Sequence, residues 1–105
     1  MDLEQAARCM ESLGNAKRLE IVRLLVKAGN AGLAVGHIQR ELGIPASTLS
    51  HHILSLVGAG LVSQQREGRI LRCLPNFDRL RGLTTLLFAE CCAGVEDAAP
   101  ASQAV

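Results

Sequence analysis

The sequence predicts a mostly α-helical fold of class α+β, with five helices and a two-stranded hairpin in a single domain of residues 1–94. Two segments with helical apolar periodicity are separated only by a short turn at Gly43, which is the spacing of a helix-turn-helix. Two extended runs joined by Glu67-Gly68 follow, as a hairpin would. At 105 residues the chain can bury one hydrophobic core but is too short for two domains. We therefore predict a winged helix-turn-helix.

The composition supports helices and argues against a membrane protein. Leucine and alanine are abundant, and aromatic residues make up 2% of the chain, which is unlike a β-sandwich. No apolar run approaches the roughly 18 residues that a membrane span needs. The N-terminal stretch MDLEQAARCM lacks the basic start and apolar core of a signal peptide. We expect a cytoplasmic protein with no membrane partner, in which the four cysteines are reduced thiols.

Three helices are predicted before the central one. The first, over residues 2–12, has one apolar side and is too short to be stable unless it packs on another element. Asn15 is placed to cap the second helix, over residues 16–28. After a glycine-rich turn at residues 29–32, a third helix over residues 35–42 ends at the helix-turn-helix turn.

The stretch from Ile44 to Val62 contains the central helix, with Pro45 at its start and Ser47 or Thr48 as caps. Its apolar residues recur at helical spacing and form one stripe: Leu49, Ile53, Leu56 and Val57. The opposite face carries short or flat polar side chains: Ser47, Ser50, His51 and Ser55. A helix that packs by one face and presents hydrogen-bonding groups on the other fits the major groove of DNA. A plain helical hairpin is the alternative.

The hairpin carries two arginines near its tip, Arg66 and Arg69, where the DNA backbone would lie. Phosphate contacts of this kind supply salt-dependent affinity and no choice of sequence. Residues 17–72 hold eight lysines and arginines against three glutamates, so the middle of the chain is basic although the net charge is only +1. The alternatives are a solvated charged surface and a hairpin that only completes the core.

The last helix is predicted from its cap at Asn76 to about Ala93, where Gly94 closes it, and residues 95–105 are expected to form a disordered tail. The first and last helices flank the helix-turn-helix, whose second helix, the central helix within residues 44–62, we call the reading helix. Each of the two flanking helices has an apolar side to bury. We expect these two helices to form a homodimer. A two-fold dimer would place its reading helices about 34–36 Å apart, which is one turn of DNA.

Cys91 and Cys92 form the second group of reactive side chains. Adjacent thiols at a fraying helix end can both turn toward one soft ion, and trivalent arsenic or antimony takes two or three sulfurs, whereas a structural zinc site normally needs four ligands. Cys9, on the helix expected beside the last one, is the only obvious third ligand. The alternative for all three is a small apolar or buried residue. Cys73, between leucines in a strand, is expected to be structural.

The histidines do not form a catalytic or zinc-binding pattern. His51 is expected to face outward, His52 to border the core and His37 to lie on the surface. Neighbouring histidines diverge on a helix, which makes a poor zinc site. A thiol or acyl-transfer enzyme would need a base beside its cysteine, and no histidine is near Cys91 or Cys92 in sequence. An enzyme is therefore the least favoured class.

Over about residues 3–93 the chain resembles the ArsR/SmtB family of bacterial metal-responsive repressors. Three segments carry the resemblance: LGNAKRLEIVRLL, IPASTLSHHILSLVGAGLV and QREGRILRC. The resemblance implies a homodimer that needs no cofactor, sits on double-stranded operator DNA and leaves when an inducer binds. It also implies base or phosphate contacts from four residues of the reading helix: Ser47, Thr48, Ser50 and His51.

The chain departs from the metal sites of that family. The CxC motif of the third helix is absent, and Asp78 has no histidine partner on the last helix. The Cys91-Cys92 pair remains, similar to arsenic-responsive members that carry thiols at the end of the last helix. Some of those use a further cysteine downstream, which this tail lacks. The site would then be completed by Cys9 of the partner chain, by an outside thiol, or by a methylated arsenical that needs only two sulfurs.

We therefore predict a repressor of an arsenic-resistance operon, released from its operator when trivalent arsenic, inorganic or methylated, binds Cys91 and Cys92; antimony is a further candidate inducer. A thiol redox or persulfide sensor of the same fold, with Cys9 bridged to one of the pair, is the alternative. A protein-interaction module that does not bind DNA belongs to a different class.

Overall fold

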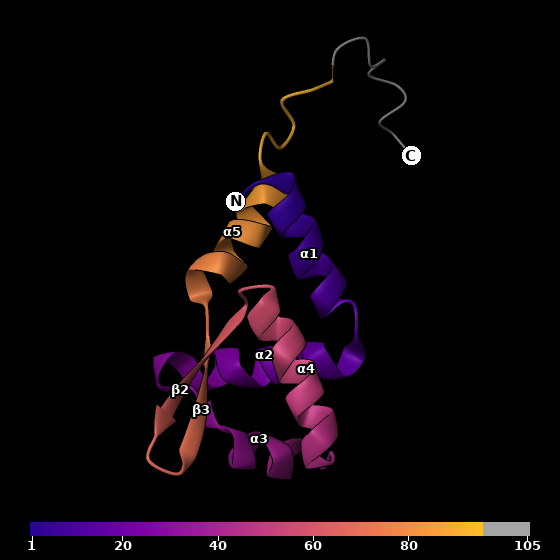
Figure 1. The fold of residues 1–105 in the computed structure, drawn as a ribbon. Coiled ribbons are helices and arrows are strands. Elements are labelled where there is room, and N and C mark those ends of the chain that lie inside the picture. The colour runs from indigo at the N-terminus through magenta and orange to yellow at the C-terminus, as the bar shows by residue number, and fades with distance from the viewer. Residues whose placement is uncertain (96–105) are drawn as a thin grey trace.

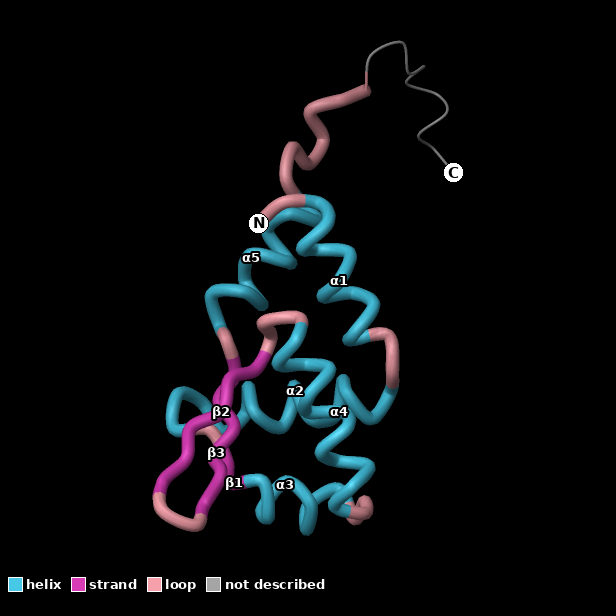
Figure 2. Tube along the Cα trace, viewed as in Figure 1, coloured by secondary structure: helices cyan, strands magenta, loops and turns pink. Residues whose placement is uncertain are grey.

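The computed structural model describes residues 1–95. This part of the chain holds five α-helices, a short 3-10 helix and three strands (Figures 1 and 2). In chain order they are α1 (Leu3–Leu13), α2 (Ala16–Ala28), η1 (Gly29–Ala31), β1 (Leu33–Ala34), α3 (Val35–Leu42), α4 (Ala46–Gly58), β2 (Val62–Glu67), β3 (Ile70–Pro75) and α5 (Phe77–Phe88). The predicted winged helix-turn-helix is confirmed, while the predicted tail from residue 96 onward lies outside the described residues. None of the described helices is both long and apolar enough to cross a membrane.

Side-chain caps define three of the helix starts. Asp2 forms a reciprocal capping box with Gln5 at the start of α1. Asn15 and Asn76 each accept a hydrogen bond from a backbone N–H in the first turn of α2 and α5. The start of α4 differs from prediction, because Pro45 is the cap residue itself and no side chain caps this helix.

The predicted hairpin is confirmed, because β2 and β3 pair in antiparallel fashion. A third strand, β1, joins it, and the strand order of the sheet is β1-β3-β2. The added strand, β1, pairs Leu33 with Cys73 and Ala34 with Arg72. The sequence did not reveal β1, because two residues are too few to show the alternation of apolar and polar side chains that marks a strand. Their pairing partner, β3, also lies far along the chain. Gly32 makes this approach possible, because a Cβ at this position would collide with the carbonyl group of Cys73.

The tip of the wing is shifted by one residue from its predicted place. Glu67 pairs with Ile70, so the two-residue loop is Gly68-Arg69 rather than Glu67-Gly68. Gly68 supplies the positive φ, 63°, that the first position of a type II′ hairpin turn requires. As a result Arg69 stands at the tip of the wing.

The core lies where α4 packs against α1, α2 and β2. Three residues of the predicted α4 stripe are almost completely buried: Leu49, Ile53 and Leu56. Ile21 and Leu25 of α2 are equally buried beside them. The apolar face of α4 therefore anchors the reading helix, as its periodicity predicted.

The helices α1 and α5 lie side by side at the end of the molecule opposite α3 (Figure 1). α5 ends at Phe88, so the prediction of a helix to about Ala93 was wrong. Two successive turns follow, closed by hydrogen bonds of 3.0 Å from Cys91 N–H to the Phe88 carbonyl and from Ala93 N–H to the Glu90 carbonyl. Leu87 and Phe88 are already exposed, so no core packing favours helical backbone beyond them.

Candidate nucleic-acid interface and cysteine pair

The outer face of α4 offers small polar groups to solvent along its N-terminal half. Four of the predicted contact residues are exposed there: Ser47, Thr48, Ser50 and His51. The buried apolar stripe on the opposite side of α4 packs this helix against the core. This is the geometry in which side chains of a reading helix reach base edges in a major groove.

Ser55 does not belong to that outer face, although its spacing suggested that it did. It is only partly exposed, and its hydroxyl oxygen lies 2.9 Å from the Ser12 hydroxyl oxygen of α1. Helix α1 covers the C-terminal half of α4, which the periodicity of α4 alone cannot reveal. The structure therefore reassigns Ser55 from a DNA contact to a contact between helices.

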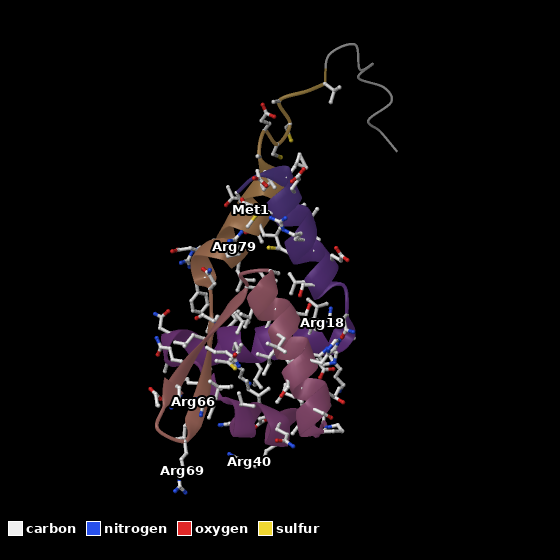
Figure 3. All side chains as sticks on the ribbon, in the orientation of Figure 1. Met1, Arg18, Arg40, Arg66, Arg69 and Arg79 are labelled. Atoms are coloured by element: carbon white, nitrogen blue, oxygen red, sulfur yellow. The ribbon has the colours of Figure 1, made fainter. Side chains whose placement is uncertain are left out.

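The wing presents its basic residues freely. Arg66 and Arg69 are exposed, and Figure 3 shows Arg69 extending outward from the tip. Arg40 of α3 is also exposed and lies at the same end of the molecule (Figure 3), so it joins the basic surface although sequence reasoning passed over it. In the sequence, Arg40 could have been recognised only as a single basic residue on the outer side of the first helix of the helix-turn-helix.

Arg72 is also basic, but its guanidinium forms hydrogen bonds within the protein. Its Nε donates to Glu67 Oε1 at 2.7 Å, and its Nη1 donates to the Ala31 carbonyl at 3.3 Å. The first contact ties β3 to β2, and the second ties the wing to η1. Arg72 therefore supports the wing, which leaves Arg66 and Arg69 to meet a polyanion.

The two adjacent histidines of α4 differ in burial, and their ring centroids are 6.2 Å apart. His51 is exposed, whereas His52 is buried and accepts a hydrogen bond from Arg18 Nε at its Nδ1, at 3.2 Å. Burial lowers the pKa of His52, and the Arg18 guanidinium and His51 lower it further. His52 is therefore a neutral hydrogen-bond acceptor, and the expectation that this pair makes a poor zinc site agrees with the diverging rings.

Cys91 and Cys92 are both exposed, and their sulfur atoms are 3.2 Å apart. Cys92 and the preceding Glu90 have positive φ angles of 63° and 60°, a conformation that non-glycine residues seldom adopt. The hydrogen bond with Cys92 raises the pKa of the Cys91 thiol, and desolvation adds to this. The pair is thus presented as two neighbouring thiols in a turn, within reach of the same atom.

The other two cysteines are buried in separate places. Cys9 is fully buried in α1, and its thiol donates to the Ala59 carbonyl at the end of α4, at 3.4 Å. Cys73 is fully buried in β3, where burial raises the pKa of its thiol, as expected of a structural residue. In residues 1–95 no three metal-ligating side chains come together, so one chain does not bring Cys9 to the Cys91-Cys92 pair.

A family model described as a helix-turn-helix domain matches residues 13–65, from the end of α1 into β2. The transcriptional regulator YgaV of Escherichia coli is 35% identical over 74 residues, covering 70% of this chain and 73% of the relative. The homodimeric winged helix-turn-helix DNA-binding domain of a possible ArsR-family regulator from Mycobacterium bovis superposes with a TM-score of 0.68 at 30% identity, covering 86% of this chain and 83% of that one.

This chain belongs to the ArsR-like helix-turn-helix transcriptional regulators. NolR from Sinorhizobium fredii is similar to this regulator to the same degree, at 30% identity and a TM-score of 0.66 over 81% of this chain and 82% of that one. The regulator is therefore a DNA-binding protein and not an enzyme. The family match ends at residue 65, so it covers the reading helix but not the cysteine pair.

Proposed function

We propose that this regulator is a homodimeric repressor of an arsenic-resistance operon, released from its operator when trivalent arsenic binds Cys91 and Cys92. The observation that carries the proposal is the pair of exposed sulfur atoms 3.2 Å apart. Soft thiolates prefer a soft ion, and nothing else at this end of α5 offers an oxygen or nitrogen site with three ligands among the described residues.

The two-sulfur site favours a methylated arsenical. Methylarsenite carries one As–C bond and two hydroxyl groups. At each cysteine an As–S bond replaces an As–O bond, and the hydroxyl takes the thiol proton and leaves as water. Two cysteines then complete the coordination of the arsenic. Inorganic arsenite, or its antimony counterpart, would keep one hydroxyl group or need a third thiol. Because Cys9 is buried at the α1–α4 contact of its own chain, an outside thiol is the simpler third ligand.

The dimer is proposed to form through the apolar sides of α1 and α5. Between these helices runs an open, largely apolar groove of about 360 Å³ lined by Leu3, Ala6, Ala7, Met10, Leu83, Leu86 and Leu87. Leu3, Leu87 and Phe88 are 76%, 61% and 72% exposed in the single chain, which is costly for large apolar side chains in water. The similar Mycobacterium bovis domain is described as homodimeric, which supports the same assembly here.

Inducer binding at the cysteine pair would act directly on that dimer face. The Cys91 N–H donates to the Phe88 carbonyl, so the pair is held one turn beyond the exposed end of α5, with Ala89 and Glu90 between them. Drawing two sulfurs onto one arsenic atom changes the turn, shifts Leu87 and Phe88, and alters the spacing of the two reading helices. A coupling free energy of 1.4 kcal/mol already changes operator affinity about tenfold.

The test is a fluorescence anisotropy titration with a duplex selected for binding by the protein itself. Methylarsenite should release the wild type at about one equivalent per chain, and Cys91→Ser and Cys92→Ser should stay bound. Cys73→Ala is the matched control, because it removes a thiol far from the pair and should still release. Release of both serine variants by methylarsenite would refute the site.

A second candidate function, a thiol redox sensor, is supported by the same distance between the sulfurs. Two-electron oxidation by hydrogen peroxide would join Cys91 and Cys92 as an adjacent disulfide. The O–O bond of the peroxide breaks, each of its oxygens takes up one thiol proton, and two water molecules leave. The structure gives no support to a bridge with Cys9 of the same chain, because that thiol is buried at Ala59. Mass spectrometry of the released protein separates the candidates: arsenic adds mass, whereas oxidation removes two hydrogens.

A further inference from the structure

Four polar side chains from three helices meet behind the reading helix, and we call them the α4 clamp: Ser12 of α1, Arg18 of α2, and His52 and Ser55 of α4. The hydroxyl oxygens of Ser12 and Ser55 are 2.9 Å apart. Arg18 donates from Nε to His52 Nδ1 at 3.2 Å and from Nη1 to the Ser12 carbonyl at 3.5 Å. One guanidinium therefore contacts both the helix of the dimer face and the reading helix.

The hydrogen bonds of the α4 clamp depend on angle, whereas the apolar contacts of the core do not. Leu49, Ile53 and Leu56 hold α4 by dispersion contacts, which require close packing but have no preferred angle. Hydrogen bonds weaken steeply when their angle is lost, and a buried polar group left without its partner is costly. Ser12 is 5% exposed and His52 9%, so neither can exchange its partner freely for water.

A small change in the orientation of α4 at the clamp displaces the DNA-facing residues at its N-terminal end. Eight residues separate Ser55 from Ser47, which is about 12 Å along a helix at 1.5 Å per residue. A tilt of about 5° about the clamp would move the first turn of α4 by about 1 Å. Hydrogen bonds to base edges tolerate only a few tenths of an ångström around their usual length. Precise orientation of α4 is therefore needed for base readout but not for phosphate contacts.

We propose that the α4 clamp positions the reading helix for operator recognition without touching DNA. Ser12, Arg18, His52 and Ser55 are positioning residues that set the rotation and tilt of α4, so that Ser47, Ser50 and His51 meet the base edges. This role depends on DNA binding by the family and is independent of any arsenic response. It predicts a specific loss of discrimination between operator and other DNA when the clamp is opened.

Arg18→Met tests this, because it removes both donors of the guanidinium but keeps most of its apolar stem. Lys17→Met is the matched control: it removes the same charge from the neighbouring residue, which within residues 1–95 forms a surface ion pair with Glu20 at 3.4 Å. Dissociation constants are measured for the operator duplex and for a scrambled duplex at several salt concentrations. Arg18→Met should weaken operator binding about tenfold relative to Lys17→Met, with equal affinities of both variants for scrambled DNA.

The salt dependence separates positioning from direct contact. A residue that contacts phosphate lowers the slope of log K against log salt by about 1 when it is removed. The clamp role predicts equal slopes for Arg18→Met and Lys17→Met. A lower slope for Arg18→Met, an equal weakening on both duplexes, or unchanged operator binding would each overturn the proposal.

Variants of His52 and of the two serines test the same proposal if Arg18→Met does not fold. His52→Asn keeps an acceptor near Nδ1 and should retain operator affinity, whereas His52→Leu should lose it while scrambled DNA is bound as before. The double variant Ser12→Ala/Ser55→Ala removes both hydroxyls together and should show the same selective loss. Equal operator affinity for His52→Asn and His52→Leu would refute the role of that hydrogen bond.

Discussion

The hydroxyl groups of Ser12 and Ser55 meet at 2.9 Å although 43 residues separate them in the chain. The contact joins α1, which carries part of the proposed dimer face, to α4, which carries the DNA-reading face. One turn along the same two helices, the Cys9 thiol donates to the Ala59 carbonyl. A side chain that sequence spacing placed toward DNA, and a thiol considered as an arsenic ligand, thus both belong to the packing between these helices.

Stability should depend on pH through His52. Its pKa is lowered, first by burial, from the value of 6.5 that the unfolded chain retains. Groups facing it are Arg18 and His51, with Arg8 and Glu11 lining the adjacent pocket. As pH falls, the unfolded chain binds a proton before the folded one, so the stability contributed by neutral His52 is complete above about pH 6.5 and is lost as pH falls toward the lower folded pKa.

Urea unfolding of the wild type and His52→Asn at several pH values measures this contribution. Asparagine does not titrate, so the difference in unfolding free energy between the two proteins should change as pH falls below 6.5 and stay constant above it. A difference that is flat over the whole range would show that His52 does not titrate differently in the two states.

The wing arginines should account for part of the salt dependence of DNA binding. Arg66→Gln and Arg69→Gln should each lower the slope of log K against log salt by about 1 on operator and scrambled DNA alike, because phosphate contacts carry no sequence information. Arg81→Gln is the control, since Arg81 is also exposed but lies on α5 and pairs with Asp78. Equal slopes in all three variants would remove the wing from the interface.

Gly32 and Gly29 make a matched pair for testing the third strand. Both have positive φ, 63° and 84°, but only a Cβ at Gly32 would collide with backbone, at the Cys73 carbonyl. Gly29→Ala should cost about 1–3 kcal/mol, because φ 84° with ψ −157° is a backbone conformation that is essentially confined to glycine. Gly32→Ala should cost more, because β1 must also move away from β3. Thermal unfolding measures both, and equal costs would mean that the close approach is relaxed in solution.

The dimer should dissociate when a charge is placed on the exposed end of α5. Leu87→Glu puts a carboxylate where the proposed interface is apolar, and we expect a monomer by light scattering together with weaker operator binding. Val26→Glu is the control, since Val26 on α2 is 43% exposed and lies outside the groove between α1 and α5. A dimeric Leu87→Glu would place the interface elsewhere.

Local sequence was sufficient for most of the elements and for the two faces of the reading helix. The stripe of Leu49, Ile53 and Leu56 repeats at helical spacing, and such periodicity is a property of neighbouring residues. The asparagine caps of α2 and α5 act within a single turn, so their positions were readable too. The resemblance of these segments to a repressor family followed from the same stretches.

Only the tertiary structure decided which polar residues of α4 are free and which are engaged. Ser55 turned out to face α1, His52 to accept from Arg18, and β1 to pair with β3, because each depends on a partner from a distant segment. The end of α5 at Phe88 likewise reflects where packing stops, and the residues beyond it have no local signal for that. Periodicity describes a helix by itself, whereas burial and hydrogen-bond partners depend on the neighbours that folding brings to it.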